Sequence, residues 1–202
     1  LAANSVVSQS ATVLTAVASP PSVKVTDVQG NPVRDVAVAF TRTVGGGVIV
    51  PASPATVTTN ASGVATLTRW TLGATPGTNT VIVSTTGVSG SPVTFNATGT
   101  TGAATQLVVT TQPAGAVSGT VFTTQPVVAI RDVANNLTSS TAAVTAAIVS
   151  GNGALTGTTT VNAVNGLATF TTLRLAGSGA HTLTFTSSAV SSATSTVLTV
   201  TQ

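Results

Sequence analysis

Short runs of alternating apolar and polar residues follow one another along the first hundred positions, separated by Gly-, Pro- and Asn-containing turns. A period of two over such short runs is typical of β-strands with one buried face. No window shows a helical period. A spacing of roughly ten residues between runs predicts a sandwich of two antiparallel sheets. The expected strands of the first half are Val23–Asp27, Val36–Arg42, Ala55–Thr59, Gly63–Thr68, Asn79–Ser84 and Pro92–Ala97.

The second half of the chain repeats the first. "SVKVTDVQGN" (Ser22–Asn31) returns as "VVAIRDVANN" (Val127–Asn136), and "GTNTVIV" (Gly77–Val83) returns as "GAHTLTF" (Gly179–Phe185). The offset stays near about one hundred residues, as expected for two copies of one folded unit.

A small, polar and Gly-containing segment, "NATGTTGAATQ" (Asn96–Gln106), separates the two copies. Such a composition is typical of a boundary between folded units. We therefore predict two tandem domains, residues 1–100 and residues 101–202.

The order of motifs carries a family resemblance. "PPSVKVTDVQGNPVRDVAVAF", "GGG", "VTTNASGVATL" and "GSPVTFNATG" resemble the bacterial immunoglobulin-like (Big) repeats of invasin/intimin-type and other large surface proteins, over Ser19–Gly99. The second copy resembles a related repeat type. The resemblance implies an all-β fold of two tandem immunoglobulin-like antiparallel β-sandwiches, in an extracellular protein of the bacterial cell surface. Such repeats occur in adhesins, stalks and filaments.

Composition excludes several classes of function. Charged residues make up 4% of the chain, where about 25% is usual for soluble domains. The sequence pI of 11.4 rests on six cations against three acids. These charges are dispersed, whereas phosphate binding needs clustered cations, so we expect no nucleic-acid partner. No apolar run reaches the roughly 18 residues of a membrane-spanning helix. The absence of cysteine excludes disulfides and Cys-based metal sites.

Two of the three acids, with Arg34, lie in "DVQGNPVRD" (Asp27–Asp35), for which we predict a hairpin between two core strands. Asp27 is expected to accept backbone N–H groups of the turn. Val36, Val38 and Phe40 should share the buried face of the following strand. In an extended chain Arg34 and Asp35 point to opposite faces and need not pair.

Calcium binding is the alternative interpretation of these carboxylates. Calcium takes six to eight oxygen ligands, but the first copy offers only Asp27 and Asp35, and the second only Asp132. The structural turn is favoured, and we predict no metal or cofactor.

His181, the only histidine, shares a strand face with Leu183 and Phe185, and Asn79 occupies its position in the first copy. We expect His181 to hydrogen-bond the backbone. A catalytic histidine needs a positioned acid or nucleophile, and the sequence shows no such constellation. We therefore predict no catalytic site and no enzymatic activity.

Three further features have both a structural and a functional interpretation. Trp70 is expected to fill the core or a strand end, although an exposed Trp could stack on a sugar or a neighbouring subunit, and Arg69 beside it either covers a ring or faces water. The "GGG" stretch lacks the Lys-Ser/Thr of a phosphate loop, which favours a loop or bulge. Matches to the glycosylation pattern arise by chance in a chain this rich in Ser and Thr; they are Asn60, Asn96 and Asn136.

These expectations lead to a structural role. We predict self-association of subunits through terminal or edge strands, giving a filament assembled head to tail, because unprotected sheet edges invite pairing. Repeats of a longer surface stalk are the rival interpretation. The alternative function is an adhesin module that binds a glycan or a host protein through loops at one end of a sandwich.

Overall fold

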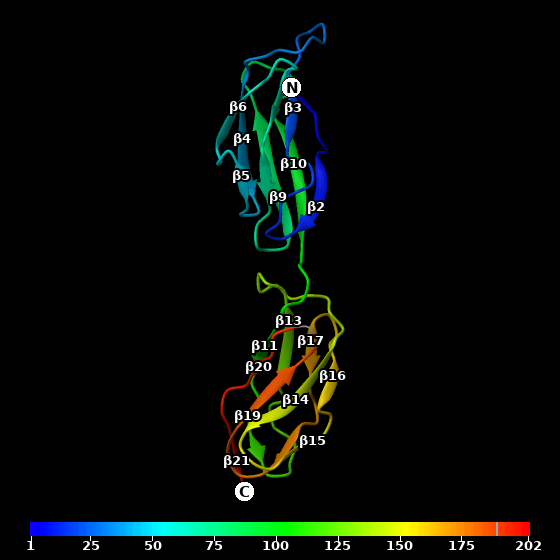
Figure 1. The fold of residues 1–202 in the computed structure, drawn as a ribbon, viewed down its shortest axis with the longest axis vertical. Coiled ribbons are helices and arrows are strands. Elements are labelled where there is room, and N and C mark those ends of the chain that lie inside the picture. The colour runs from blue at the N-terminus through cyan, green and yellow to red at the C-terminus, as the bar shows by residue number, and fades with distance from the viewer. Residues whose placement is uncertain (189) are drawn as a thin grey trace. The chain divides into compact units, whose positions relative to one another are not determined.

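The computed structural model describes residues 1–188 and 190–202, and within them the chain forms strands and no helix. The chain divides into two compact units, unit 1 (Leu1–Thr101) and unit 2 (Gly102–Gln202). Each unit is built of small stacked sheets, in which most neighbouring strands are antiparallel (Figure 1). The predicted all-β fold of two tandem sandwiches is confirmed.

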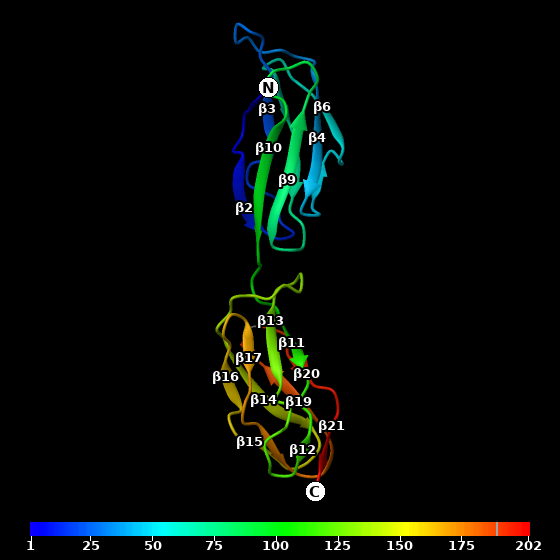
Figure 2. The same ribbon diagram turned by 180° about the vertical axis from the view of Figure 1, so that it is seen from behind.

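Unit 1 contains a three-stranded and a five-stranded sheet, and a separate two-stranded ribbon. The three-stranded sheet has the order β1 (Ala2–Ala3), β3 (Ser22–Lys24), β7 (Val64–Thr66). The five-stranded sheet has the order β2 (Ser8–Thr12), β10 (Val93–Thr100), β9 (Gly77–Ser84), β4 (Ala37–Val44), β6 (Ala55–Thr58). The ribbon pairs β5 (Val48–Val50) with β8 (Arg69–Thr71). Figure 2 shows β2, β10, β9 and β4 side by side.

The N-terminal segment of unit 1 contributes to both sheets. β1 runs antiparallel to β3, and β2 then pairs in parallel with the last strand, β10. The remaining neighbours in both sheets are antiparallel. This arrangement is that of an immunoglobulin-like sandwich.

The core of unit 1 follows from the alternation of the sequence. Val38 and Phe40 of β4, Val81 and Val83 of β9, and Phe95 of β10 are all fully buried. Side chains of a strand point alternately to opposite faces, so each of these strands buries one face between the sheets.

Unit 2 repeats this plan with more irregular strands. Its three-stranded sheet has the order β11 (Gln106–Thr111), β13 (Val127–Arg131), β17 (Leu167–Thr169). The larger sheet has the order β12 (Ala116–Val117), β21 (Leu198–Thr201), β19 (Gly179–Thr186), β14 (Ala143–Ser150), β16 (Thr160–Asn162), and β20 (Ala193–Thr194) also pairs with β19. A ribbon joins β15 (Ala154–Thr156) to β18 (Arg174–Ala176). As in unit 1, the first strand of the larger sheet, β12, is parallel to the last, β21.

The chain does turn back on itself at Asp27–Asp35, with Thr26 bridged to Pro32, but the prediction that this hairpin links two paired core strands is wrong. β3 belongs to the three-stranded sheet and β4 to the five-stranded sheet, so the segment crosses from one sheet to the other. Alternation fixes which face of a strand is buried but not which strand it pairs with. The expectation that Val36, Val38 and Phe40 share a buried face is confirmed, with Val36 packed at the edge of the core.

Candidate functional site

Two of the three carboxylates, the side chains most able to act as acids, bases or ligands, lie in two equivalent turns. We call them the Asp27 turn (residues 27–31) and the Asp132 turn (residues 132–136). In the first, Asp27 Oδ1 accepts the N–H groups of Gln29 at 3.0 Å and Asn31 at 2.8 Å. Asp27 Oδ2 accepts Asn31 Nδ2 at 2.9 Å. The predicted role of Asp27 as a turn-holding acceptor is confirmed.

The Asp132 turn repeats this set of bonds and adds one. Asp132 Oδ1 accepts the N–H groups of Ala134 at 2.9 Å and Asn136 at 2.8 Å, and Oδ2 accepts Asn136 Nδ2 at 3.0 Å. Oδ2 also accepts the N–H of Gly102, the first residue of unit 2, at 2.9 Å. Asp132 is fully buried, whereas Asp27 is exposed.

These bonds set the ionisation of both carboxyls. For Asp132, burial raises the pKa, but the bonds from the Asn136 side chain and from the N–H groups of Gly102, Asn136 and Ala134 outweigh burial and leave the pKa lowered. For Asp27, the bond from the Asn31 side chain is the largest cause of a lowered pKa. Hydrogen bonds donated to a carboxylate favour its charged form.

The third carboxylate is paired with its neighbour in sequence. Arg34 Nε donates to Asp35 Oδ2 at 2.8 Å, with both side chains about 70% exposed. The expectation that the two point apart assumed an extended chain, but Asp35 has a φ of 60°. This left-handed conformation brings the two side chains together. An ion pair this exposed contributes little to stability.

A metal site does not form from these residues. Within residues 1–188 and 190–202, no three His, Asp or Glu side chains gather in a way that could hold a metal ion. The oxygens of Asp27 are bonded to its own turn, and Asp35 bonds to Arg34. The carboxylates therefore act as structural acceptors.

His181 is fully buried in β19, beside Leu183 and Phe185 as predicted. Its Nδ1 lies 3.0 Å from the carbonyl oxygen of Gly179, and its Nε2 also contacts a carbonyl oxygen, that of Asn152. The expected bonding to the backbone is confirmed. The ring fixes the bend between β14 and β15 against the start of β19.

Asn79, at the corresponding position of unit 1, also bonds to backbone, although one of its partners lies in the loop after β8. Asn79 Nδ2 donates to Gly77 O at 3.2 Å, and its Oδ1 accepts the N–H of Gly73 at 3.1 Å. A β-carbon on Gly45 would lie 2.2 Å from Asn79 Oδ1. The "GGG" stretch, Gly45–Gly47, is thus the bend between β4 and β5, as the sequence predicted, and not a ligand loop.

All six aromatic side chains of the chain lie in the two cores. Trp70 is fully buried, which confirms the prediction of a core position, and neighbouring Arg69 is exposed. The phenylalanines are also buried: Phe40, Phe95, Phe122, Phe170 and Phe185. In the part of the chain that the structure describes, no aromatic ring is therefore available at the surface to stack on a sugar.

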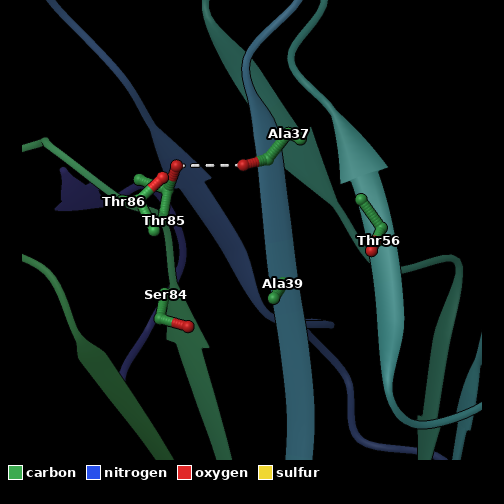
Figure 3. A pocket seen from close by; sticks show the side chains of 6 residues that line it. All are labelled: Ala37, Ala39, Thr56, Ser84, Thr85 and Thr86. Carbon is green, nitrogen blue, oxygen red and sulfur yellow. Dashed lines mark hydrogen bonds between the residues drawn. The ribbon is translucent and has the colours of Figure 1, made fainter.

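The sequence did not indicate a hollow on the outer face of the five-stranded sheet. It has a volume of about 250 Å³ and is lined by Ala37, Ala39, Thr56 and Ser84–Thr86. Thr85 Oγ donates to Ala37 O at 2.9 Å across it (Figure 3). Its lining of small hydroxyl and methyl groups has no acid, base or aromatic ring to recognise a ligand.

The sequence also failed to indicate the bond between Gly102 and Asp132. The two residues are thirty positions apart, and nothing local marks a glycine N–H as a partner of a distant turn. The three Asn-X-Ser/Thr matches have structural roles where their bonds are described: Asn60 Oδ1 accepts two N–H groups of its own turn, Asn96 Oδ1 accepts Thr80 Oγ, and Asn136 bonds to Asp132.

Comparisons with known proteins give neighbours only among solved structures. No protein-family model matches the chain, and no curated protein matches with significance. The D0-D1 domain of intimin aligns over 100% of this chain and 97% of its own, with 20% identity and a TM-score of 0.38. Adhesin InvE of Yersinia pseudotuberculosis aligns over 96% of this chain and 56% of its own, with 22% identity and a TM-score of 0.40. Adhesin FdeC of Escherichia coli aligns over 98% of this chain and 64% of its own, with 16% identity and a TM-score of 0.45.

These neighbours are bacterial immunoglobulin-like adhesin domains. The chain spans 56% of the InvE structure and 64% of the FdeC structure. Within the described residues, no helix has the length and apolar character that crossing a membrane would require.

Proposed function

We propose that the chain is a structural module of the bacterial cell surface, in which residues 1–100 and 101–202 each form an immunoglobulin-like domain. One observation carries this proposal: the three acids and the single histidine all bond to groups of their own unit. Asp27 and Asp132 hold turns, Asp35 pairs with Arg34, and His181 contacts two backbone carbonyls. The side chains that could perform chemistry are thus used to build the fold.

We further propose that copies of the chain associate through sheet edges. An uncharged edge is open to pairing, since natural monomers protect edges with charged residues. In the larger sheets, leaving aside the two-stranded ribbons with Arg69 in β8 and Arg174 in β18, the edge strands contain no charged residue: β1 (AA), β7 (VAT), β2 (SQSAT) and β6 (ATVT) in unit 1, and β11 (QLVVTT), β17 (LAT), β12 (AV) and β16 (TVN) in unit 2.

Strand β1 is the best candidate for exchange between copies. It pairs with β3 through only two residues, Ala2 and Ala3, and both are exposed. If β1 left its own sheet, these two pairs, the flanking bonds of Leu1 to Ser89 and of Asn4 to Ser22, and the packing of Leu1 would be lost. Unit 1 of another copy offers the same partners. Exchange of this kind would join subunits head to tail by backbone hydrogen bonds.

A disulfide tests strand exchange, because the protein has no cysteine of its own. Ala2 and Lys24 are directly paired in register, so Ala2→Cys with Lys24→Cys should lock β1 in place when oxidised. We expect filaments by electron microscopy from the reduced double variant and none from the oxidised one. The single variant Ala2→Cys is the matched control. Filaments from the oxidised form would exclude exchange of β1.

The mass of the native polypeptide separates a filament subunit from a stalk. A subunit made of this chain alone has a mass of 19.5 kDa, whereas repeats of a stalk belong to a much larger polypeptide. Recognition of glycans is tested separately by a glycan array on the purified protein. Since every aromatic ring is buried, we expect no glycan to bind; specific binding would favour the adhesin alternative.

A further inference from the structure

The main chain that leads into unit 2 lies along the Asp132 turn. Gly102 N–H donates to Asp132 Oδ2 at 2.9 Å, and Thr105 N–H donates to Arg131 O at 2.8 Å. Gln106 Nε2 adds a bond to Asp132 O at 3.1 Å. We call the segment from Gly102 to Gln106 the lead-in. It is therefore held against the Asp132 turn, mainly through its backbone, where the chain enters β11.

The loop that follows β19 holds the lead-in from the other side. Ser191 N–H donates to Thr105 O at 2.9 Å, and Leu107 N–H donates to Ser191 O at 3.0 Å. Ala104 of the lead-in packs against the core of unit 2. The lead-in thus fills the space between the Asp132 turn and the loop around Ser191.

In unit 1, the residues that correspond to the Asp132 turn and to the loop around Ser191 border an open groove. The groove has a volume of about 450 Å³ and is lined by Leu1, Thr26–Val28 and Gly87–Ser89. In the repeat, Thr26 and Asp27 correspond to Arg131 and Asp132. The Leu1 nitrogen donates to Ser89 O, just as the Leu107 N–H donates to Ser191 O. The groove therefore has the position that the lead-in fills in unit 2.

The residues that border the groove in unit 1 are more exposed than the corresponding residues of unit 2, as expected for a groove that is open. Asp27 is exposed and Asp132 is fully buried, while Leu1 is half-buried and Leu107 is 5% exposed. Among the described residues, Asp27 Oδ2 accepts one hydrogen bond, from Asn31 Nδ2, where Asp132 Oδ2 accepts two. A carboxylate oxygen has room for a second donor.

We propose that this groove is a seat for extended main chain of the same polypeptide, running directly into Leu1, with Asp27 Oδ2 accepting an N–H five residues ahead of Leu1. The seat recognises backbone, not a particular side chain. Thr26 O accepts a second N–H, and Ser89 N–H donates to a carbonyl, as Arg131 and Ser191 do in unit 2. Small residues suit it, because the lead-in contains Gly102, Ala103 and Ala104.

Thr26, Asp27 and Ser89 would then form a clamp, a set of backbone contacts that fixes the path by which the preceding segment enters unit 1. The inference deepens the proposed function, because serial surface modules need a defined entry into each unit. Its test reads the stability of unit 1 alone and does not depend on filaments or ligands, so failure of the clamp and failure of the surface role are distinguishable.

The experiment adds the lead-in sequence Gly-Ala-Ala-Thr-Gln ahead of Leu1 in the full chain. Trp70, the only tryptophan, lies in the core of unit 1, so its fluorescence follows unfolding of that unit. We expect the extension to raise the unit 1 Tm by about 5 °C or more. Pro in place of the added Gly lacks the N–H that Asp27 accepts and should abolish most of the gain.

A double-mutant cycle with Asp27→Ala completes the test, because this substitution also weakens the turn itself. The extension should raise the Tm of the Asp27→Ala chain much less than that of the wild-type chain. Equal gains with and without Asp27, or no gain at all, would overturn the proposal. All Tm values are compared at a protein concentration at which the chain is monomeric, because exchange of β1 between copies would itself make the unit 1 Tm depend on concentration.

Discussion

His181 shows how a residue type associated with catalysis serves the fold. The ring is fully buried and both nitrogens face backbone carbonyls, while Asn79 of unit 1 bonds to the carbonyl of Gly77, the counterpart of Gly179. Asn can still donate to Gly179 O, but Leu would leave the buried carbonyls without a donor. We expect His181→Leu to destabilise unit 2 by about 1–3 kcal/mol and His181→Asn to cost less.

Far-UV circular dichroism during denaturation measures both substitutions at His181. The fluorescence of Trp70 is the internal control, since it reports unit 1 and should stay at the wild-type midpoint. If His181→Leu is as stable as the wild-type protein, the ring does not hold the bend through its bonds to backbone.

Asp132 gives unit 2 a dependence on pH. Its folded-state pKa is lowered, whereas the unfolded value is about 3.9. The carboxylate therefore stabilises unit 2 above about pH 4, and this contribution is lost as the pH falls through the folded-state pKa. In the wild-type protein we therefore expect the denaturation midpoint of unit 2, measured by circular dichroism, to decrease when the pH is lowered below about 4.

The Asp132→Asn variant is the matched comparison. It should be less stable than the wild-type protein at pH 7, because its amide nitrogen would face the donors of Gly102 and Asn136, and it should lack the acid-induced loss that comes from residue 132. An identical slope of stability against pH in both proteins below pH 4 would show that Asp132 does not cause it.

At the scale of elements, the sequence predicted the central strands well. The expected Ala55–Thr59 and Asn79–Ser84 correspond to β6 (Ala55–Thr58) and β9 (Gly77–Ser84). Alternation over several residues determines these strands because their buried faces must match. The strands β5 and β8 were missed because β5 (VIV) has no polar position to show an alternation, and β8 (RWT) directly follows the predicted strand Gly63–Thr68 with no turn residue between them.

The alternation of apolar and polar residues does not predict which strands pair or which residues far apart in the sequence form hydrogen bonds. The segment after β3 was expected to form a hairpin, yet it crosses between sheets, since local pattern does not specify a partner strand. The Asp27 turn was predictable because its bonds are local, spanning two to four residues. The Gly102–Asp132 bond was not, because it depends on the fold bringing distant residues together.

The bend between β4 and β5 allows a matched test of local geometry. Gly45 and Gly46 both have positive φ values, +92° and +71°, but only a β-carbon on Gly45 would collide, at 2.2 Å from Asn79 Oδ1. We expect Gly46→Ala to cost about 1–2 kcal/mol from backbone conformation alone. Gly45→Ala should cost more, in unit 1 denaturation followed by Trp70 fluorescence. Equal costs would mean that the bend relaxes around the methyl group.

At the scale of the whole molecule, each unit has its own core. Phe185 lies in the core of unit 2 and Val83 in the core of unit 1, at corresponding positions of the repeat. We expect Phe185→Ala to destabilise unit 2 by about 3–5 kcal/mol and to leave the Trp70 fluorescence midpoint unchanged. Val83→Ala should shift the fluorescence midpoint instead. A shift of Trp70 fluorescence in Phe185→Ala would show that the two cores unfold together.

The parallel pairing of first and last strands has a mechanical consequence. Tension between the two ends of unit 1 drags β2 and β10 in opposite directions along their shared length, because both strands run the same way. Five registered pairs, from Ser8↔Asn96 to Thr12↔Thr100, then bear the load together and rupture in one event. The corresponding strands of unit 2 share two pairs, so stretching single molecules should break unit 2 at the lower force and leave unit 1 as the stronger link.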